Sequence, residues 1–212
     1  MRTIWNLEEA KAYHHHSPSL ARLLARFLPR NESVIDLGCG VGFYADHLER
    51  KGFEVYAVEG TEGIQTIALF KRIISFDLSR PIDFTLPLSS VISLEVGEHL
   101  LPEQEEVFLD NLCKFCRDRL VLSWAVPGQG GYGHYNERTN DAIICRLFDR
   151  DFILDARGTD FLRQSFDHRE APYFRNTLMT FRRIPGSLPG RHRGRGPGRQ
   201  KKRGAGRRAP RP

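Results

Sequence analysis

The run VIDLGCGVGFYADHL at residues 34–48 constrains the fold of this chain more than any other feature. An apolar stretch leads into three glycines at alternate positions, Gly38, Gly40 and Gly42, and a helical pattern follows them. Glycine lets the backbone turn tightly and approach a ligand without interference from a Cβ atom. In open α/β sheets such a junction lies at the carboxyl end of a strand, where ligands bind. The run therefore predicts a ligand-binding turn between a strand and a helix.

The spacing of the glycines and one carboxylate indicate which kind of ligand this turn holds. A dinucleotide fingerprint reads GxGxxG and uses its third glycine for close helix–strand packing, but Phe43 stands at that position here. Asp36 lies near the turn, where its carboxylate would repel a pyrophosphate and attract an ammonium group. Both features favour a ligand that carries an amino acid over NAD.

Short β-type runs alternate with helix-type runs up to residue 184, which is typical of a mostly parallel sheet covered on both faces. We therefore expect an α/β fold with a Rossmann-like, doubly wound sheet of seven strands. The expected strands span residues 34–37, 55–58, 72–76, 91–94, 120–124, 152–154 and 177–182. The expected helices span residues 20–27, 44–51, 103–115, 140–148 and 160–165.

The positive charge is concentrated at one end of the chain, which has 212 residues and a formal net charge of +6. Residues 185–212 contain ten Arg or Lys and no Asp or Glu, whereas residues 1–184 contain 22 basic and 26 acidic residues. Because the basic segment has almost no apolar residue, burial could not offset the entropy lost on ordering. We expect a folded domain at 1–184 and a disordered tail at 185–212. Such a tail would attract nucleic acid or another anionic partner without sequence selectivity.

The composition also indicates where the protein works. No stretch approaches the ~20 apolar residues of a membrane-spanning helix, and the N-terminus has acidic residues where a signal peptide needs basic ones. The four cysteines are too few and too unevenly spaced for a secreted disulfide framework. Cys113 and Cys116 have the spacing of half a zinc site, but their helical pattern favours small core residues. We expect a soluble, cytoplasmic protein with reduced thiols.

With this turn, the chain resembles the class I S-adenosylmethionine-dependent methyltransferases whose first motif reads DxGxGxG. The resemblance spans about residues 5–183 and continues with VYAVEGTEGI and RIISFDL. It implies that S-adenosylmethionine is the cofactor and that the last strand runs antiparallel. It also implies that Glu59 binds the ribose, while Asp77 and Leu78 hold the adenine. The implied cofactor-binding residues are Tyr13, Asp36, Gly38, Cys39, Gly40, Glu59, Gly60, Asp77, Leu78 and Leu94.

The segment LEVGEHL, after the fourth expected strand, resembles the ExxEH stretch of two groups in this family. These are the ubiquinone-pathway O-methyltransferases and the small-RNA 2′-O-methyltransferases, in which two Glu and the His help to bind a divalent metal ion. The resemblance implies metal ligands at Glu95, Glu98 and His99, with His134 as the fourth. In related enzymes without a metal the His is a general base or simply packs, so His99 and His134 are also candidate catalytic residues. The sequence leaves both roles open.

Two further segments carry polar and aromatic side chains. The glycine-rich residues 127–136 are expected to form a loop or lid on the acceptor side. Three consecutive histidines at 14–16 point in different directions on a helix, so a solvated helix start or loop is expected there. The side chains expected to contact the acceptor are Trp124, Gln129, Tyr132, His134 and Asn136.

The expected function is methyl transfer from S-adenosylmethionine to an oxygen of a small-molecule or nucleic-acid acceptor. Most of the rate would come from positioning the two bound reactants. The alternative is an RNA-binding protein with a vestigial methyltransferase fold and a basic binding tail. The intact glycine turn, with Glu59 and Asp77 behind it, is evidence against a dead site. A dehydrogenase is a third possibility, and Phe43 is evidence against it.

Overall fold

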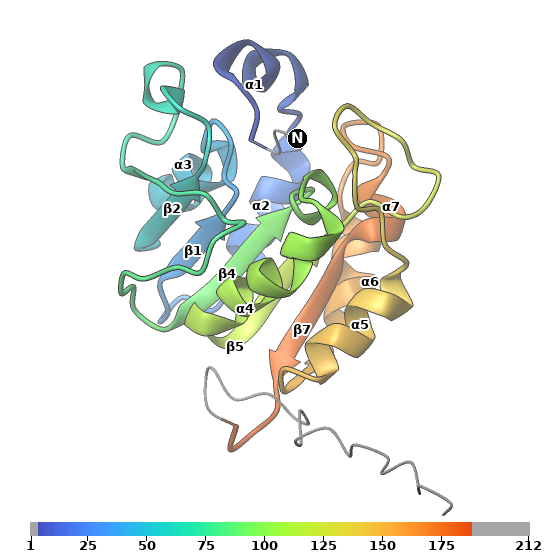
Figure 1. The fold of residues 1–212 in the computed structure, drawn as a ribbon. Helices are drawn as coiled ribbons and strands as arrows, with labels where there is room; N and C mark the ends of the chain where they lie inside the picture. Colours follow the sequence, from blue (N-terminus) through green and yellow to red (C-terminus); the bar gives the residue numbers. More distant parts are fainter. Residues whose placement is uncertain (1–3, 188–212) are drawn as a thin grey trace, which may run out of the picture.

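The computed structural model describes residues 4–187, which form a central sheet with helices on both faces (Figure 1). The sheet has seven strands in the order β3-β2-β1-β4-β5-β7-β6. These are β1 (Val34–Leu37), β2 (Val55–Glu59), β3 (Ile73–Ser75), β4 (Ser89–Leu94), β5 (Cys116–Ser123), β6 (Phe152–Leu154) and β7 (Met179–Arg183). All pairings are parallel except those of β7, which runs antiparallel to β5 and β6. This confirms the predicted Rossmann-like, doubly wound sheet with an antiparallel last strand.

Seven α-helices and three short 3-10 turns surround the sheet within the described residues. The helices are α1 (Leu7–Tyr13), α2 (Pro18–Phe27), α3 (Phe43–Arg50), α4 (Glu105–Phe115), α5 (Asn140–Phe148), α6 (Ala156–Ser165) and α7 (Phe174–Thr177). The 3-10 turns are η1 (Ile64–Thr66), η2 (Gly97–His99) and η3 (Pro102–Gln104). The predicted basic tail lies outside the described residues, apart from residues 185–187.

The sequence did not predict α1 and α7. Helix α1 is short, and a capping box fixes its start: the side chain of Asn6 accepts from the backbone N–H of Glu9, and the side chain of Glu9 accepts from that of Asn6. Helix α7 is a single turn, too short to show a helical period, and it includes Thr177, which was predicted to begin the last strand. Hydrogen bonds between backbone and side chain therefore fix the start of α1, which apolar periodicity could not reveal.

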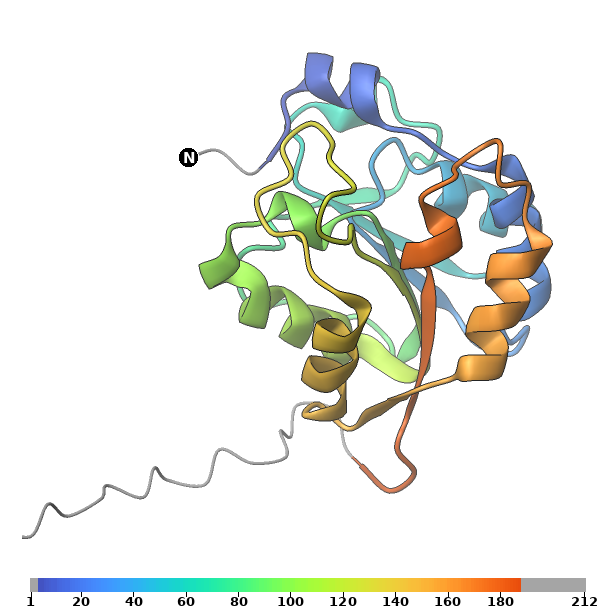
Figure 2. The same cartoon turned by 90° about the vertical axis from the view of Figure 1, so that its right-hand side faces the viewer.

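Alternate residues of the strands face the two sides of the sheet and build two apolar cores. Helices α2, α3 and α6 pack on the core that contains Val34, and α4 and α5 pack on the core that contains Ile35 (Figure 2). Cys113 and Cys116 are buried in the second core with free thiols, as predicted. None of the helices within residues 4–187 has the length and apolar character that a membrane crossing needs.

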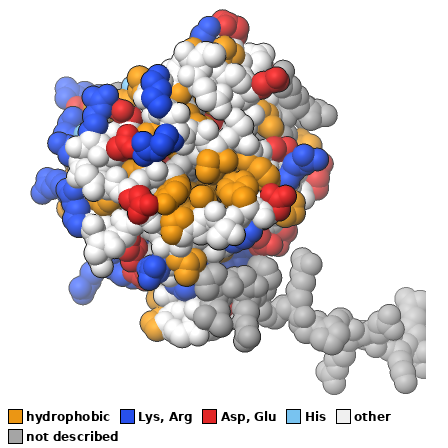
Figure 3. Space-filling view, turned by 90° about the vertical axis from the view of Figure 1, so that its left-hand side faces the viewer, with side chains coloured by type: hydrophobic (Ala, Val, Ile, Leu, Met, Phe, Trp, Pro, Cys, Tyr) orange, Lys and Arg blue, Asp and Glu red, His pale blue; other side chains and the backbone are white. Residues whose placement is uncertain are grey.

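Strand β3 forms one edge of the sheet, and residues 76–88, which lead from it to β4, contain no helix. Figure 3 looks onto this side of the molecule and shows apolar side chains gathered at the surface between charged ones. Ile74, Phe76, Phe84 and Leu86 are partly buried against the second core here. An irregular segment, and not a helix, therefore covers this part of the sheet.

Candidate functional site

A cavity of about 630 Å³ lies where β1, β2 and β4 reach their carboxyl ends, and α1 lies across this end of the sheet (Figure 1). Its volume is in the range of pockets that hold a cofactor-sized ligand. The structure places all ten predicted cofactor-binding residues in its lining. They are Tyr13, Asp36, Gly38, Cys39, Gly40, Glu59, Gly60, Asp77, Leu78 and Leu94.

The glycine turn after β1 has a backbone that other residues rarely adopt. Gly38, Gly40 and Gly42 have φ angles of 81°, 55° and 75°, all in the left-handed region. A Cβ atom on Gly38 would lie 2.5 Å from a methyl carbon of Val96, and one on Gly42 would lie 2.6 Å from the Cβ of Phe70. The turn is therefore closely packed against Val96 and Phe70, and this packing fixes its backbone conformation.

Glu59, at the end of β2, holds this turn in place. Its Oε2 accepts from the backbone N–H of Gly40 at 2.9 Å. Its Oε1 accepts from the backbone N–H and the hydroxyl of Thr61, at 2.9 Å and 2.8 Å. Since an ionised carboxylate has about four acceptor positions, Glu59 can still accept about one hydrogen bond from a ligand in the cavity.

Asp36 is a buried carboxyl group without a positive partner among residues 4–187. Its side chain lies in β1 with 2% of the residue exposed, and its Oδ2 has no hydrogen-bond partner in that range. Burial, together with the nearby Glu59 carboxylate, raises the pKa of Asp36 to about 8. A cationic ligand in the cavity would favour the ionised form and supply the missing partner.

The adenine end predicted from the sequence lies after β3. The Oδ1 of Asp77 accepts from the backbone N–H of Ser79 at 2.9 Å, which fixes the side chain at the cavity wall. Leu78 is buried, and its carbonyl oxygen accepts from the side-chain amide of Asn111 at 3.0 Å. A carboxylate beside an apolar side chain suits the amino edge and the ring of an adenine.

Aromatic side chains from two distant segments cover the cavity. The ring of Tyr13, at the end of α1, stacks on that of Tyr132 with centroids 4.3 Å apart. The Tyr132 hydroxyl donates to Oε1 of Glu9 at 2.7 Å. Trp5 places its ring edge-on to His99, with centroids 4.7 Å apart. These contacts join the N-terminal segment to the loop at 127–136 across the cavity.

The structure corrects the expectation that all three consecutive histidines are solvated. His15 and His16 are exposed, but the ring of His14 stacks on Trp5 with centroids 5.1 Å apart and lines the cavity. A Cβ atom on Gly40 would lie 2.9 Å from the His14 ring, so this histidine packs directly on the glycine turn. Burial lowers the pKa of His14.

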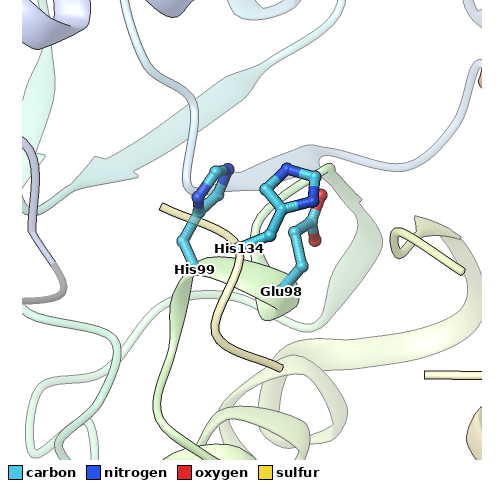
Figure 4. Close-up of side chains that lie close together, drawn as sticks. All are labelled: Glu98, His99 and His134. Atoms are coloured by element: carbon cyan, nitrogen blue, oxygen red, sulfur yellow. The ribbon is translucent and has the colours of Figure 1, made fainter. Parts of the chain in front are cut away.

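Three of the four residues predicted to bind a metal ion come together. One ligand atom each of Glu98, His99 and His134 lies within 4.8 Å of the others (Figure 4). Glu98 and His99 lie in η2, whereas His134 comes from the loop at 127–136. Glu95 is not in this group, because its carboxylate accepts from the Gln129 amide at 2.7 Å and from the Thr177 hydroxyl at 3.1 Å.

Hydrogen bonds orient both rings of this cluster. Nδ1 of His99 lies 3.1 Å from the carbonyl oxygen of Gly133, so Nδ1 carries the proton and Nε2 has a free lone pair. Nδ1 of His134 lies 3.3 Å from Oε1 of Glu137. Burial lowers the pKa of His99 to about 4, so its ring is neutral near pH 7.

Glu98 is fully buried beside these rings, and neither of its carboxylate oxygens has a hydrogen-bond partner within the described part of the chain. Burial, with the nearby Glu95 carboxylate as a second cause, raises the pKa of Glu98 well above its usual range. A buried carboxyl group without a partner is costly, and such groups are often found where a ligand supplies the missing contact.

Two residues expected to contact the acceptor are part of the core instead. Trp124 is fully buried and donates from its indole N–H to the carbonyl oxygen of Asn136 at 2.6 Å. The side-chain amide of Asn136 donates to the buried Glu105 at 3.0 Å. Gln129, Tyr132 and His134 line the cavity as expected.

The sequence analysis did not identify Tyr173 and Thr177 as neighbours of the site. Tyr173 lines the cavity, and Thr177 donates to Glu95. Both lie around the single turn α7, where no periodicity or motif marks the chain. Only the tertiary fold brings this turn to the end of β4.

Comparisons with solved structures show how widely this fold is shared. The TehB-like SAM-dependent methyltransferase from Corynebacterium glutamicum is 19% identical, with a TM-score of 0.60 over 84% of this chain and 92% of that chain. Magnesium protoporphyrin IX methyltransferase from Synechocystis PCC 6803, with bound SAH, is 21% identical, with a TM-score of 0.56 over 77% and 79%. The cyclase SpnF is 12% identical, with a TM-score of 0.56 over 81% and 85%. Because one of these proteins is a cyclase, the fold alone does not identify the reaction.

Sequence comparisons identify the family. A search of curated protein sequences found no match. The family profile described as "Methyltransferase domain" matches residues 12–123, which is more than half of the chain and includes the glycine turn, Glu59, Asp77 and the Glu98–His99 turn. The chain therefore belongs to the methyltransferase-domain family.

Proposed function

We propose that this protein uses S-adenosylmethionine to methylate an oxygen atom of a small-molecule or nucleic-acid acceptor. The observation that carries the proposal is the convergence of the ten predicted cofactor-binding residues on one cavity of about 630 Å³. Membership of the methyltransferase-domain family supports the reaction type. The position of the cavity, at the carboxyl ends of parallel strands, is the usual ligand site of such sheets.

Three carboxylates in the cavity each match a hydrogen-bond donor of the cofactor. Asp36 would accept from the ammonium group of the methionine part, which would give this buried carboxylate the positive partner that it lacks. Glu59 would accept from a ribose hydroxyl with its remaining acceptor position. Asp77 would accept from the exocyclic amine of the adenine, with Leu78 against the ring.

When bound, S-adenosylmethionine supplies an electrophilic methyl group on a positively charged sulfonium. The residues of this chain would hold the acceptor in line with that group, and this positioning would provide most of the rate. Tyr13, Tyr132 and Trp5 cover the cavity and would exclude water from it. His99 could take the proton of the acceptor hydroxyl at Nε2, since its Nδ1–H is bound to the Gly133 carbonyl.

A second role for the same cluster is to bind a divalent metal ion, and the surroundings of Glu98 favour this role. Both oxygens of this fully buried carboxylate lack a hydrogen-bond partner in the described residues. His99 and His134 each have one ring nitrogen engaged, which is the usual arrangement of a histidine whose other nitrogen binds a metal. Glu98, His99 and His134 would hold the ion, which would lower the pKa of the acceptor hydroxyl.

Isothermal titration calorimetry on the full chain tests the cofactor. We expect S-adenosylhomocysteine to bind and NAD to show no heat of binding, because the cavity contains carboxylates where a pyrophosphate would lie. The exposed Glu62, changed to Gln, is a control with the same loss of charge outside the cavity. NAD binding without S-adenosylhomocysteine binding would identify a dehydrogenase. Binding of RNA without binding of S-adenosylhomocysteine or NAD would support the alternative of an RNA-binding protein with a vestigial methyltransferase fold.

Thermal unfolding tests the metal ion without the need for an acceptor. After treatment with a chelator, add-back of Mn²⁺, Mg²⁺ or Zn²⁺ should raise the unfolding temperature, because a ligand that binds only the folded state stabilises it. The variant Glu98→Gln should lose this response, and Glu62→Gln should keep it. If no ion shifts the unfolding temperature of the unchanged protein, the metal role is wrong and His99 remains the candidate base.

A further inference from the structure

The cavity has an excess of negative charge. No Lys or Arg among residues 4–187 lines it, and partial burial lowers the pKa of two lining imidazoles, those of His14 and His16. The carboxylates that line it are Asp36, Glu59, Asp77 and Glu95. Pockets that bind phosphate or carboxylate groups usually present Arg or Lys to them.

Buried oxygens without partners show the same imbalance independently. Oδ2 of Asp36 and both carboxylate oxygens of Glu98 have no hydrogen-bond donor in the described part of the chain. Asp36 is 2% exposed and Glu98 is 0% exposed, so water does not easily satisfy them. Donor groups or positive charge must therefore come from what binds in or beside the cavity.

The cofactor of the proposed function does not restore the balance. S-adenosylmethionine has a sulfonium, an ammonium group and one carboxylate, and therefore a net charge of about +1 near neutral pH. That charge offsets one of the four lining carboxylates, since Asp36 opposite the ammonium group is ionised. Negative charge from three carboxylates remains, and the acceptor must enter this field.

Glu95 is the one of these four lining carboxylates that was not predicted to bind the cofactor. Its φ angle of 54° is unusual for a residue other than glycine, and its backbone N–H donates to the Ser123 hydroxyl at 2.8 Å. Gln129 and Thr177 each donate one hydrogen bond to its carboxylate, which keeps the side chain in one position. An ionised carboxylate with two such bonds can still accept about two more.

Aromatic rings line the same cavity as this carboxylate. They are Trp5, Tyr13, Tyr132 and Tyr173, and the Glu95 carboxylate is close enough to Tyr173 to help raise the pKa of its hydroxyl, after burial as the main cause. The faces of such rings attract organic cations and pack well on planar molecules. Charge and aromatic lining therefore favour the same kind of molecule.

We propose that the methyl acceptor is a small organic amine whose N–H groups donate to Glu95, and that anionic acceptors, including polynucleotides, are excluded. This inference rests on the proposed methyl transfer and narrows its acceptor to one class. The hydroxyl to be methylated and the amine would be parts of one small molecule. Glu95 would act as a specificity-determining residue.

The test compares the binding of matched aromatic amines and aromatic carboxylates that have the same ring and a hydroxyl, such as tyramine and 4-hydroxyphenylacetate. Binding to the full chain, saturated with S-adenosylhomocysteine, is followed by ligand-observed NMR at millimolar probe. We expect the amines to bind and the carboxylates not to bind. Glu95→Gln should weaken amine binding about tenfold, as expected for loss of a charge-assisted hydrogen bond. The exposed Glu62→Gln should leave amine binding unchanged.

The affinity for S-adenosylhomocysteine is measured first for each protein, which shows that the variant is folded and keeps the two hypotheses separate. If S-adenosylhomocysteine does not bind, the proposed function fails. If it binds but the carboxylates bind as well as the amines, or neither class binds, the inference about the acceptor is wrong. Amine binding that is unchanged in Glu95→Gln would likewise overturn the role of Glu95.

Discussion

Replacement of Asp36 by Asn should stabilise the fold and weaken cofactor binding, and the stability gain should depend on pH. Asp36 is buried, and its pKa is raised from 3.8 to about 8. Between these values the unfolded chain is ionised at this position, whereas the folded protein holds a proton. The folded state therefore binds more protons, and its stability falls as the pH rises from about 4 to 8. Asn is neutral at every pH and avoids this loss.

The size of the effect follows from the same pKa values. At pH 7 the solution is about three pH units above the pKa of Asp36 in the unfolded chain, and each unit corresponds to about 1.4 kcal/mol. The Asn variant should thus be more stable than the unchanged protein by up to about 4 kcal/mol at pH 7, and by almost nothing at pH 4. In the bound state, loss of a carboxylate opposite an ammonium group should weaken S-adenosylhomocysteine at least about tenfold.

Urea unfolding across pH 4 to 8 and calorimetry with S-adenosylhomocysteine measure the two effects on the same protein. The exposed Asp83, changed to Asn, is the matched control and should show neither effect. A stability difference that does not change with pH would refute the reasoning about the proton. Unchanged affinity would show that Asp36 does not bind the cofactor.

Three further predictions concern other parts of the site and the tail. Glu59→Gln should weaken S-adenosylhomocysteine about tenfold in calorimetry, and unchanged affinity would contradict the ribose role. Gly97→Ala should lower the free energy of unfolding, measured in urea, by about 1–3 kcal/mol, because the added Cβ would lie 2.3 Å from the buried Trp124 ring. An unchanged free energy of unfolding would mean that η2 can move away from this ring. Deletion of residues 188–212 should leave cofactor affinity unchanged but reduce the salt-dependent binding of RNA, and an equal salt slope with and without these residues would show that they do not bind nucleic acid.

The sequence predicted the residues on the cofactor side of the cavity because these residues lie in short motifs. The turn from Gly38 to Gly42 and the strand ends at Glu59 and Asp77 are short motifs, and parallel strands bring their carboxyl ends to one edge. The antiparallel orientation of the last strand came from family resemblance, and β7 has it in the structure. Local patterns and a known topology therefore gave the fold and placed these residues together.

The acceptor side was harder to predict because its contacts are long-range. The ExxEH spacing suggested that Glu95 would join Glu98 and His99, but the left-handed backbone at Glu95 turns its side chain towards Thr177. No pattern in the sequence reveals a φ angle at a residue other than glycine. His14 was likewise assigned to solvent, since its position depends on how the N-terminal segment crosses the sheet.

The bonds that hold the loop at 127–136 decide which wall of the cavity can move when ligands enter and leave. The backbone N–H groups of Tyr135 and Asn136 both donate to the carbonyl oxygen of Glu98, at 2.8 Å and 2.9 Å, and Gly133 accepts from His99. Loop and η2 therefore form one rigid body, although the glycines suggested a mobile lid. The contacts of α1 with this body are side-chain contacts, at Tyr13 and Glu9. We therefore expect the cavity to open by movement of the N-terminal helix, with His99 and His134 held together by the bonds between the loop and η2.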